Sequence, residues 1–132
     1  MVLIDILKDL EDFCYIPVVL IPVEHLYPMV KPRASEEVIR LIDRDGLKQP
    51  LVVLNTTKEE WERESKGNPL ILPPPPTDGV IHQIRGGNNR YQWLIKNNIK
   101  EAPCNVFYNR NEAADEMRRQ ERWHNKKYGR LT

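Results

Sequence analysis

Two glycines followed by two asparagines and an arginine are the part of this sequence best suited to bind an anion. Gly86 and Gly87 let the backbone approach a bound group closely or adopt positive φ angles that other residues resist. The segment 80–95 predicts a short strand, a break and then a helix. The first N–H groups of a helix lack partners within it and lie at the positive end of its dipole. Arg90 adds a forked cation beside them, so this pattern favours a phosphate as the ligand.

A simpler interpretation of the same residues stays open. Asn88 or Asn89 is expected to cap the helix, because an Asn side chain accepts hydrogen bonds from free N–H groups there. In the alternative, the glycines serve only the geometry of the turn and Arg90 lies in solvent. Glycine-rich turns before helices are common, so spacing alone does not separate the two.

Composition narrows the class of protein. The 132 residues predict one domain, and 40% hydrophobic with 30% charged residues is ordinary for a soluble protein. A net charge of +1 argues against wholesale electrostatic binding to nucleic acid. We expect a cytoplasmic protein without membrane contact, because no apolar run is long enough to span a bilayer. Cys14 and Cys104 are expected to be reduced and buried, with a disulfide as the alternative.

Hydrophobic periodicity predicts a single α/β (α+β) domain over residues 1–132. Ser35 and Gly46 have the residue types of a helix cap and a helix stop. The N-terminal helix is expected to pack on the core, with partner binding as the alternative. We expect helices at 1–14 (its apolar stripe within 2–13), 36–44, 91–98 and 111–128, and strands at 15–21, 51–54, 80–85 and 104–108.

Residues 56–79 have the character of an insertion in a hairpin. Thr57 and Glu60 form a capping-box pattern that opens a short charged helix. Four prolines, Pro73–Pro76, then predict an extended polyproline segment. Such a segment is either a rigid spacer or a ligand for an SH3-type partner.

The sequence contains, in order, Ile21-Pro-Val-Glu-His-Leu26, Lys31-Pro-Arg33, Gly46-Leu-Lys-Gln-Pro-Leu51, Gly86-Gly-Asn-Asn-Arg-Tyr91 and Ala102-Pro-Cys-Asn-Val106. In this order the segments resemble the ParB/sulfiredoxin superfamily, over about residues 16–124. The resemblance implies a small mixed sheet with surrounding helices and a phosphate-binding turn at a helix N-terminus. Small stand-alone members are frequent in phages and mobile elements, and are often labelled ParB-like nucleases.

The resemblance also implies a ligand. ParB proteins hold the phosphates of CTP with a Gly-Leu-x-Gln-Pro turn, a Gly-Glu-Arg-Arg turn and a Glu-Asn-x-x-Arg segment. Sulfiredoxin binds ATP phosphate with Gly-Gly-Cys-His-Arg-Tyr, which includes its catalytic cysteine. A nucleoside triphosphate, CTP or ATP, with Mg²⁺ is therefore implied here. The implied phosphate-binding residues are Gly86, Gly87, Asn88, Asn89, Arg90, Gln49 and Arg33, with Glu121 as a metal contact.

The chain departs from both family patterns. Asn88 stands where sulfiredoxin has its cysteine, and an amide cannot replace a thiolate nucleophile, so that activity is not expected. Asn88 and Asn89 also replace the acidic residue and first arginine of the ParB turn. Near the Glu-Asn-x-x-Arg position the chain has Gln120, Glu121 and His124. Whether the protein is an enzyme stays open.

The last predicted helix is a second candidate for contact with phosphates. Its basic residues are interleaved with Trp123 and Tyr128, which could stack on exposed bases, and the alternative is a solvated amphipathic helix. The candidate contacts are Arg118, Arg119, Arg122, Lys126 and Lys127. His25, His82 and His124 lack the spacing of zinc ligands.

Three classes of function follow. The first is a ParB-like nucleotide- or phosphate-binding module in DNA metabolism or its regulation. The second is a Mg²⁺-dependent nuclease or phosphoryl-transfer enzyme at the same pocket. The third is a protein-interaction module that kept the fold without the ligand and binds a partner through the N-terminal helix or the proline-rich insertion. A homodimer is compatible with each.

Overall fold

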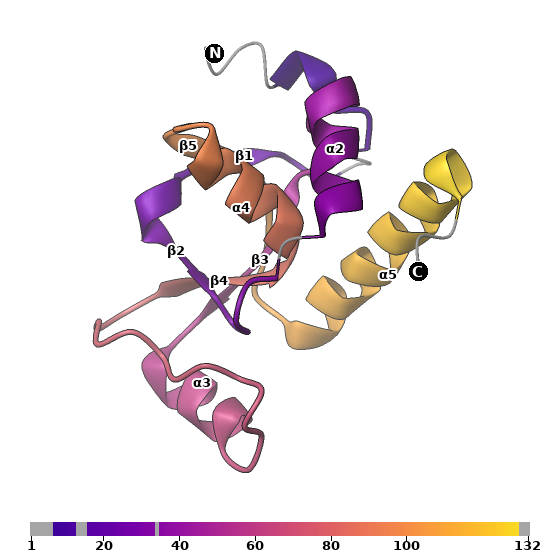
Figure 1. Cartoon of the computed structure of the whole chain (residues 1–132). Helices are drawn as coiled ribbons and strands as arrows, with labels where there is room; N and C mark the ends of the chain where they lie inside the picture. Colours follow the sequence, from indigo (N-terminus) through magenta and orange to yellow (C-terminus); the bar gives the residue numbers. More distant parts are fainter. Residues whose placement is uncertain (1–6, 13–15, 34, 130–132) are drawn as a thin grey trace.

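The computed structural model describes residues 7–12, 16–33 and 35–129. A short helical turn at residues 7–9 precedes the named elements. These elements, in chain order, are β1 (Val19–Pro22), the 3-10 helix η1 (Val23–His25), β2 (Leu26–Pro28), α2 (Glu36–Asp45), β3 (Leu51–Thr56), α3 (Lys58–Ser65), β4 (Ile81–Gly86), α4 (Asn88–Lys96), β5 (Glu101–Phe107) and α5 (Arg110–Tyr128) (Figure 1).

The five strands form one mixed sheet in the order β1-β5-β3-β4-β2. The central strand β3 pairs antiparallel with β4, as the predicted hairpin requires, and parallel with β5. β1 is antiparallel to β5, and β2 is parallel to β4. The predicted α+β class with a small mixed sheet is therefore confirmed.

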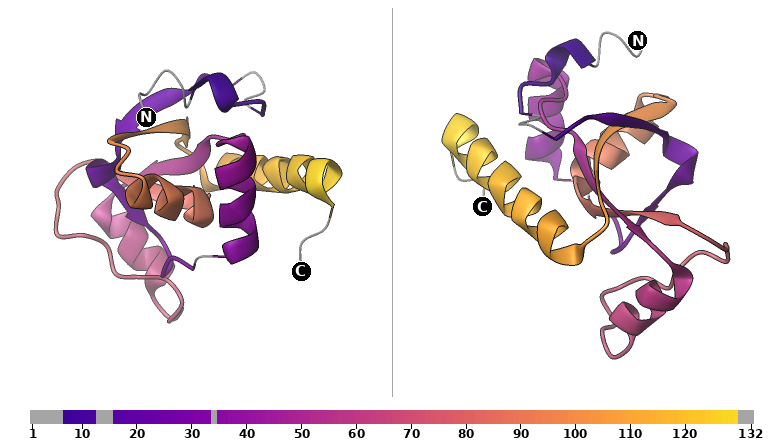
Figure 2. Two further views of the ribbon diagram at one scale, coloured as in Figure 1. Left: turned by 45° about the horizontal axis from the view of Figure 1, so that its top comes forward. Right: turned by 180° about the vertical axis from the view of Figure 1, so that it is seen from behind.

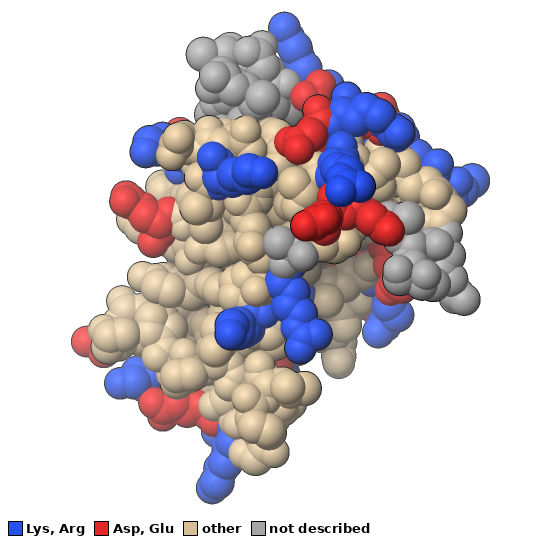
Figure 3. All heavy atoms as spheres, viewed as in Figure 1, with Lys and Arg blue, Asp and Glu red and all other residues tan. Residues whose placement is uncertain are grey.

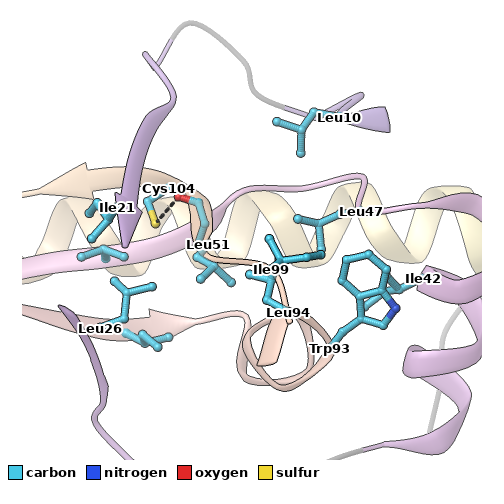
Figure 4. Packing of buried hydrophobic residues seen from close by; sticks show 13 residues of the cluster. Leu10, Ile21, Leu26, Ile42, Leu47, Leu51, Trp93, Leu94, Ile99 and Cys104 are labelled. Atoms are coloured by element: carbon cyan, nitrogen blue, oxygen red, sulfur yellow. Dashed lines mark hydrogen bonds between the residues drawn. The ribbon is translucent and has the colours of Figure 1, made fainter. Parts of the chain in front are cut away.

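Strand β3 is buried on both faces, as its run of four apolar residues predicts. On one face, Leu51 and Val53 join the larger core cluster with Trp93 of α4 and Ile42 of α2 (Figure 4). On the other face, Val52 and Leu54 pack with a smaller cluster that includes Ala113 of α5. The helices α2 and α4 thus cover one side of the sheet and α5 the other (Figure 2).

Two predicted helix caps are confirmed. The Ser35 side chain accepts a hydrogen bond from the Val38 N–H, and Gly46, with φ of 85°, ends α2. The Thr57 side chain accepts from the Glu60 N–H at the start of α3. In both cases the cap and its partner are three residues apart, so the pattern is visible in the sequence.

The predicted cap of α4 was wrong. The helix begins at Asn88, earlier than expected, and its N-cap is Gly87 with no side-chain cap. The Asn89 side chain instead accepts the Ser35 N–H at 2.7 Å. This hydrogen bond connects the start of α4 to the start of α2. The Asn89 side-chain oxygen, which was predicted to cap α4, is therefore occupied by the backbone N–H group of Ser35.

The N-terminal segment also differs from its prediction. Within the described residues 7–12, the helix covers only 7–9, while 1–6 and 13–14 lie outside the described residues. It ends early because the N–H groups of Glu11 and Asp12 both donate to the Lys48 carbonyl, at 3.0 and 2.9 Å. The expected strand at 15–21 is shorter and later, at Val19–Pro22, with Tyr15 outside the described residues. Strand β5 starts at Glu101 rather than after Pro103.

The insertion is fastened to the rest of the domain rather than projecting freely. Trp61 of α3 is 1% exposed, and its indole N–H donates to the Leu72 carbonyl at 2.7 Å. The Leu72 N–H in turn donates to the Met29 carbonyl at 2.8 Å. The start of the proline-rich segment is therefore held between α3 and the end of β2. In the described part of the chain, no helix is long and apolar enough to cross a membrane.

Candidate anion-binding site

A cavity of about 280 Å³ lies where β4 runs into α4, between α2 and α5. It brings together most of the predicted phosphate-binding residues. Arg33 is exposed and is not among the residues that line it. The lining residues are Val38, Gln49, Gly86, Gly87, Asn88, Asn89, Arg90, Met117, Gln120, Glu121 and His124.

Close packing requires glycine at position 87 and leaves little room for a side chain at position 86. Gly87 has φ of 100° and ψ of 32°, in the left-handed region. A Cβ atom on Gly87 would lie 2.6 Å from Leu51 Cδ2 and 2.9 Å from Arg90 Cζ. A Cβ atom on Gly86 would lie 3.1 Å from Met117 Cγ, so α5 packs directly on the end of β4. The glycines thus serve geometry, and that geometry brings Arg90 against the turn.

Arg90 folds back over this turn and is partly buried. Its Nη1 donates to the Pro50 carbonyl and, at 2.9 Å, to Gln120 Oε1. No described carboxylate forms an ion pair with it. Burial lowers the pKa of Arg90 to about 10, against the opposing influence of Asp12 and Glu116. The guanidinium therefore stays charged at neutral pH, and both its bonding partners are uncharged.

A buried polar network lies behind the cavity. Arg119 donates to Asp12 Oδ1 at 2.6 Å and to the two oxygens of Glu116 at 2.7 and 2.6 Å. Gln120 donates to the Pro50 carbonyl at 3.1 Å and to Glu116 at 3.2 Å. Asp12 and Glu116 are only 4% and 5% exposed, and Arg119 pairs with both.

Gln49 belongs to this network as much as to the cavity. Its Nε2 donates to Asp12 Oδ2 at 2.7 Å and to the Gln120 backbone carbonyl at 2.8 Å. An amide nitrogen carries two hydrogens, so both are used within the protein. In this arrangement the Gln49 side chain has no N–H left for the second phosphate that the sequence assigned to it.

The residues predicted for metal and thiol chemistry lie apart. Glu121 is exposed on the cavity rim, and among the described residues no group of three His, Cys, Asp or Glu side chains could hold a metal ion. Cys104 is a free cysteine and is fully buried. Burial raises the pKa of its thiol to about 12. A thiol with this pKa is not a thiolate at neutral pH. Cys14 lies outside the described residues.

The basic residues of α5 take different roles. Arg119 lies in the internal network, and Arg118 pairs with Asp115. Lys127 pairs with Glu11 and lies 5.3 Å from the centroid of the Trp123 ring. Arg122 and Lys126 are exposed. On the face shown in Figure 3, positive and negative side chains are interspersed.

Sequence reasoning missed the polar network as a unit. Glu116 and Arg119 are three residues apart on a predicted helix, which is a spacing that a search for ion pairs would find. The contact of Arg119 with Asp12 spans 107 positions, and no local pattern indicates it.

No protein-family model matches the chain, and no curated protein matches it. Similar solved structures include a conserved hypothetical protein from Pyrococcus furiosus, 19% identical, covering 69% of this chain and 32% of that one with a TM-score of 0.46. A second is a C-terminally truncated chromosome-partitioning protein ParB from Caulobacter crescentus complexed with CTP-gamma-S, 20% identical, covering 88% and 55% with a TM-score of 0.46. A third is sulfiredoxin from Arabidopsis thaliana, 17% identical, covering 76% and 96% with a TM-score of 0.44.

The chain therefore spans about a third of the first structure and about half of the second. Both families that the sequence resembles, ParB and sulfiredoxin, are found among these structures. At these identities and TM-scores, neither a function nor a ligand follows from the likeness.

We expect Gly87→Ala to destabilise the protein more than Gly79→Ala does. Both glycines have positive φ, a conformation that costs other residues about 1–2 kcal/mol. They differ in the space around them, because nothing lies within 4 Å of a Cβ atom on Gly79. The crowding at Gly87 adds roughly 1–3 kcal/mol. Urea unfolding of both variants measures the difference, and equal losses would contradict the packing of this turn.

We expect His124 to make folding sensitive to mild acid. Burial, and secondarily the charge of Arg90, lower its pKa below the ordinary value of 6.5. The unfolded chain therefore binds the proton more readily, and the free energy of unfolding falls as pH decreases below about 6.5. Burial also lowers the pKa of His82, which acts in the same direction. The free energy of unfolding should differ less between pH 7 and pH 5 in His124→Gln than in the unaltered protein. An equal difference would contradict the burial of His124 beside Arg90.

Proposed function

We propose that this chain is a ParB-like nucleotide- or phosphate-binding module that acts in DNA metabolism or its regulation. The observation that carries the proposal is the Arg90 guanidinium, a partly buried cation that lines a cavity and contacts no described carboxylate. A buried charge is costly unless it is paired. An anion in the cavity would supply the missing partner.

The start of α4 supports the same ligand. Asn88 and Asn89 line the cavity and stand in the first turn of the helix, whose N–H groups have no partners within it. The positive end of the helix dipole lies there as well. Both hydrogen bonds that Arg90 donates come from Nη1, so Nε and Nη2 remain as donors. Backbone N–H groups and a forked cation together are the usual means of holding a phosphate.

The size of the cavity bears on what it holds. At about 280 Å³ it lies near the lower end of ligand pockets, which are roughly 300–1,000 Å³. It therefore suits a phosphate chain better than a whole nucleotide, whose nucleoside part would extend through the mouth of the cavity. CTP and ATP are the candidates implied by the sequence resemblance. Mg²⁺ often uses one or two carboxylates plus substrate phosphates, and Glu121 on the rim fits that role.

Calorimetric titration with CTP, ATP and ADP, each with and without Mg²⁺, tests the proposal. We expect saturable binding that Arg90→Ala weakens about tenfold to hundredfold, because it removes a charge-assisted contact. Arg90→Lys keeps the charge without the fork and should recover part of the loss. Arg118→Ala, which removes an exposed arginine of α5 paired with Asp115, is the matched control and should bind normally.

Two results would contradict the proposal. One is the absence of heat and of thermal stabilisation with every nucleotide and with pyrophosphate. The other is unchanged affinity in Arg90→Ala, which would place the ligand elsewhere. Because Arg90 also holds Pro50 and Gln120, the fold of each variant must be verified by circular dichroism and thermal unfolding first.

A further inference from the structure

The segment 7–12, here called the N-terminal arm, is laid against the turn that carries Gln49. The Glu11 and Asp12 N–H groups donate to the Lys48 carbonyl, and Leu10 enters the core. The Asp9 side chain lies so close to Gly46 that a Cβ atom there would be 2.3 Å from its Oδ2. The arm therefore lies against the C-terminal end of α2 (Figure 1).

The Asp12 carboxylate takes the hydrogen-bond donors on this side of the site. Its Oδ2 accepts from Gln49 at 2.7 Å, and its Oδ1 accepts from Arg119 at 2.6 Å. Gln49 lines the cavity beside Arg90, whereas Arg119 does not line it and is bound on the far side by Glu116. Asp12 is thus an anion of the protein itself, bound to an amide and a guanidinium that are suited to a phosphate.

We propose that the N-terminal arm competes with the ligand, with Asp12 standing in for one of its phosphates. The inference rests on the proposed function and adds a regulation of that same site. A ligand with one phosphate needs only Arg90 and the start of α4, which the arm leaves open. A diphosphate or triphosphate gains the Gln49 side chain only when Asp12 leaves it.

The attachments of the arm allow such a release. Glu11 pairs with Lys48 at 3.2 Å and with Lys127, and its side chain is 47% exposed. Ion pairs made by an exposed carboxylate contribute little and weaken with salt. The arm forms no strand of the sheet, so it can detach without breaking any strand pairing. Its main anchors are then Leu10, the Asp12 carboxylate and the two N–H bonds to the Lys48 carbonyl.

Titrations of the full chain with CTP and CMP distinguish this competition from a structural role of Asp12. We expect Asp12→Ala to bind CTP about tenfold more tightly than the unaltered protein. The ligand then no longer has to break the charge-assisted hydrogen bond between Asp12 and Gln49, and one such bond corresponds to about this factor. Its affinity for CMP should not change. Asp12→Asn, nearly the same in shape, should shift CTP binding in the same direction if Asp12→Ala folds poorly. Glu59→Ala, an exposed change of equal charge on α3, should leave both affinities unchanged.

Hydrogen exchange gives a second readout in the unaltered protein. Saturating CTP should speed exchange at the Glu11 and Asp12 amides, which donate to Lys48 when the arm is docked, and CMP should not. Equal or weaker CTP binding by Asp12→Ala, or slower exchange in the arm with CTP, would overturn the competition alone. Failure of every variant to bind CTP, CMP or pyrophosphate would overturn the proposed function and this inference with it.

Discussion

The carbonyl oxygen of Pro50 is the point on which the candidate site depends. It accepts hydrogen bonds from Arg90 of α4 and from Gln120 of α5, and Pro50 itself is fully buried. A buried carbonyl without a partner is costly, so both side chains are drawn to the same atom. This convergence brings the start of α4, the middle of α5 and the turn before β3 around one cavity. Gly87 makes it possible, because a Cβ atom there would collide with Leu51 of β3, and Gly86 allows the close packing of Met117 of α5.

The charges around this point are arranged in two layers. Arg119, farther from the cavity, lies between two buried carboxylates and is satisfied by them. Arg90, at the cavity, contacts only neutral oxygens. The positive potential is therefore local, which explains how a chain with a net charge of +1 can offer an anion site. The basic run of α5 looks more important in the sequence, yet Arg118, Arg119 and Lys127 are already paired with acids of the protein.

The sequence predicted what depends on neighbouring residues. The hairpin of β3 and β4, the buried strand β3, and the caps at Ser35 and Thr57 follow from short patterns. The errors have a common physical cause, which is competition from distant groups. Asn89 is taken by the Ser35 N–H, 54 positions away, and Gln49 is taken by Asp12, 37 positions away. The glycine turn was found because its residue types are unusual, whereas the pairing of Asp12 with Arg119 has no local signal.

Binding of an anion at the start of α4 can be followed residue by residue in a titration monitored by nitrogen and proton NMR. With pyrophosphate added, we expect the largest shifts at the backbone amides of Asn88 and Asn89 and at the Arg90 side chain, which lie at the start of α4. These shifts should saturate together and report one binding event. Saturable shifts confined to Arg122 and Lys126, the exposed cations of α5, would contradict this expectation, as would no shift at all.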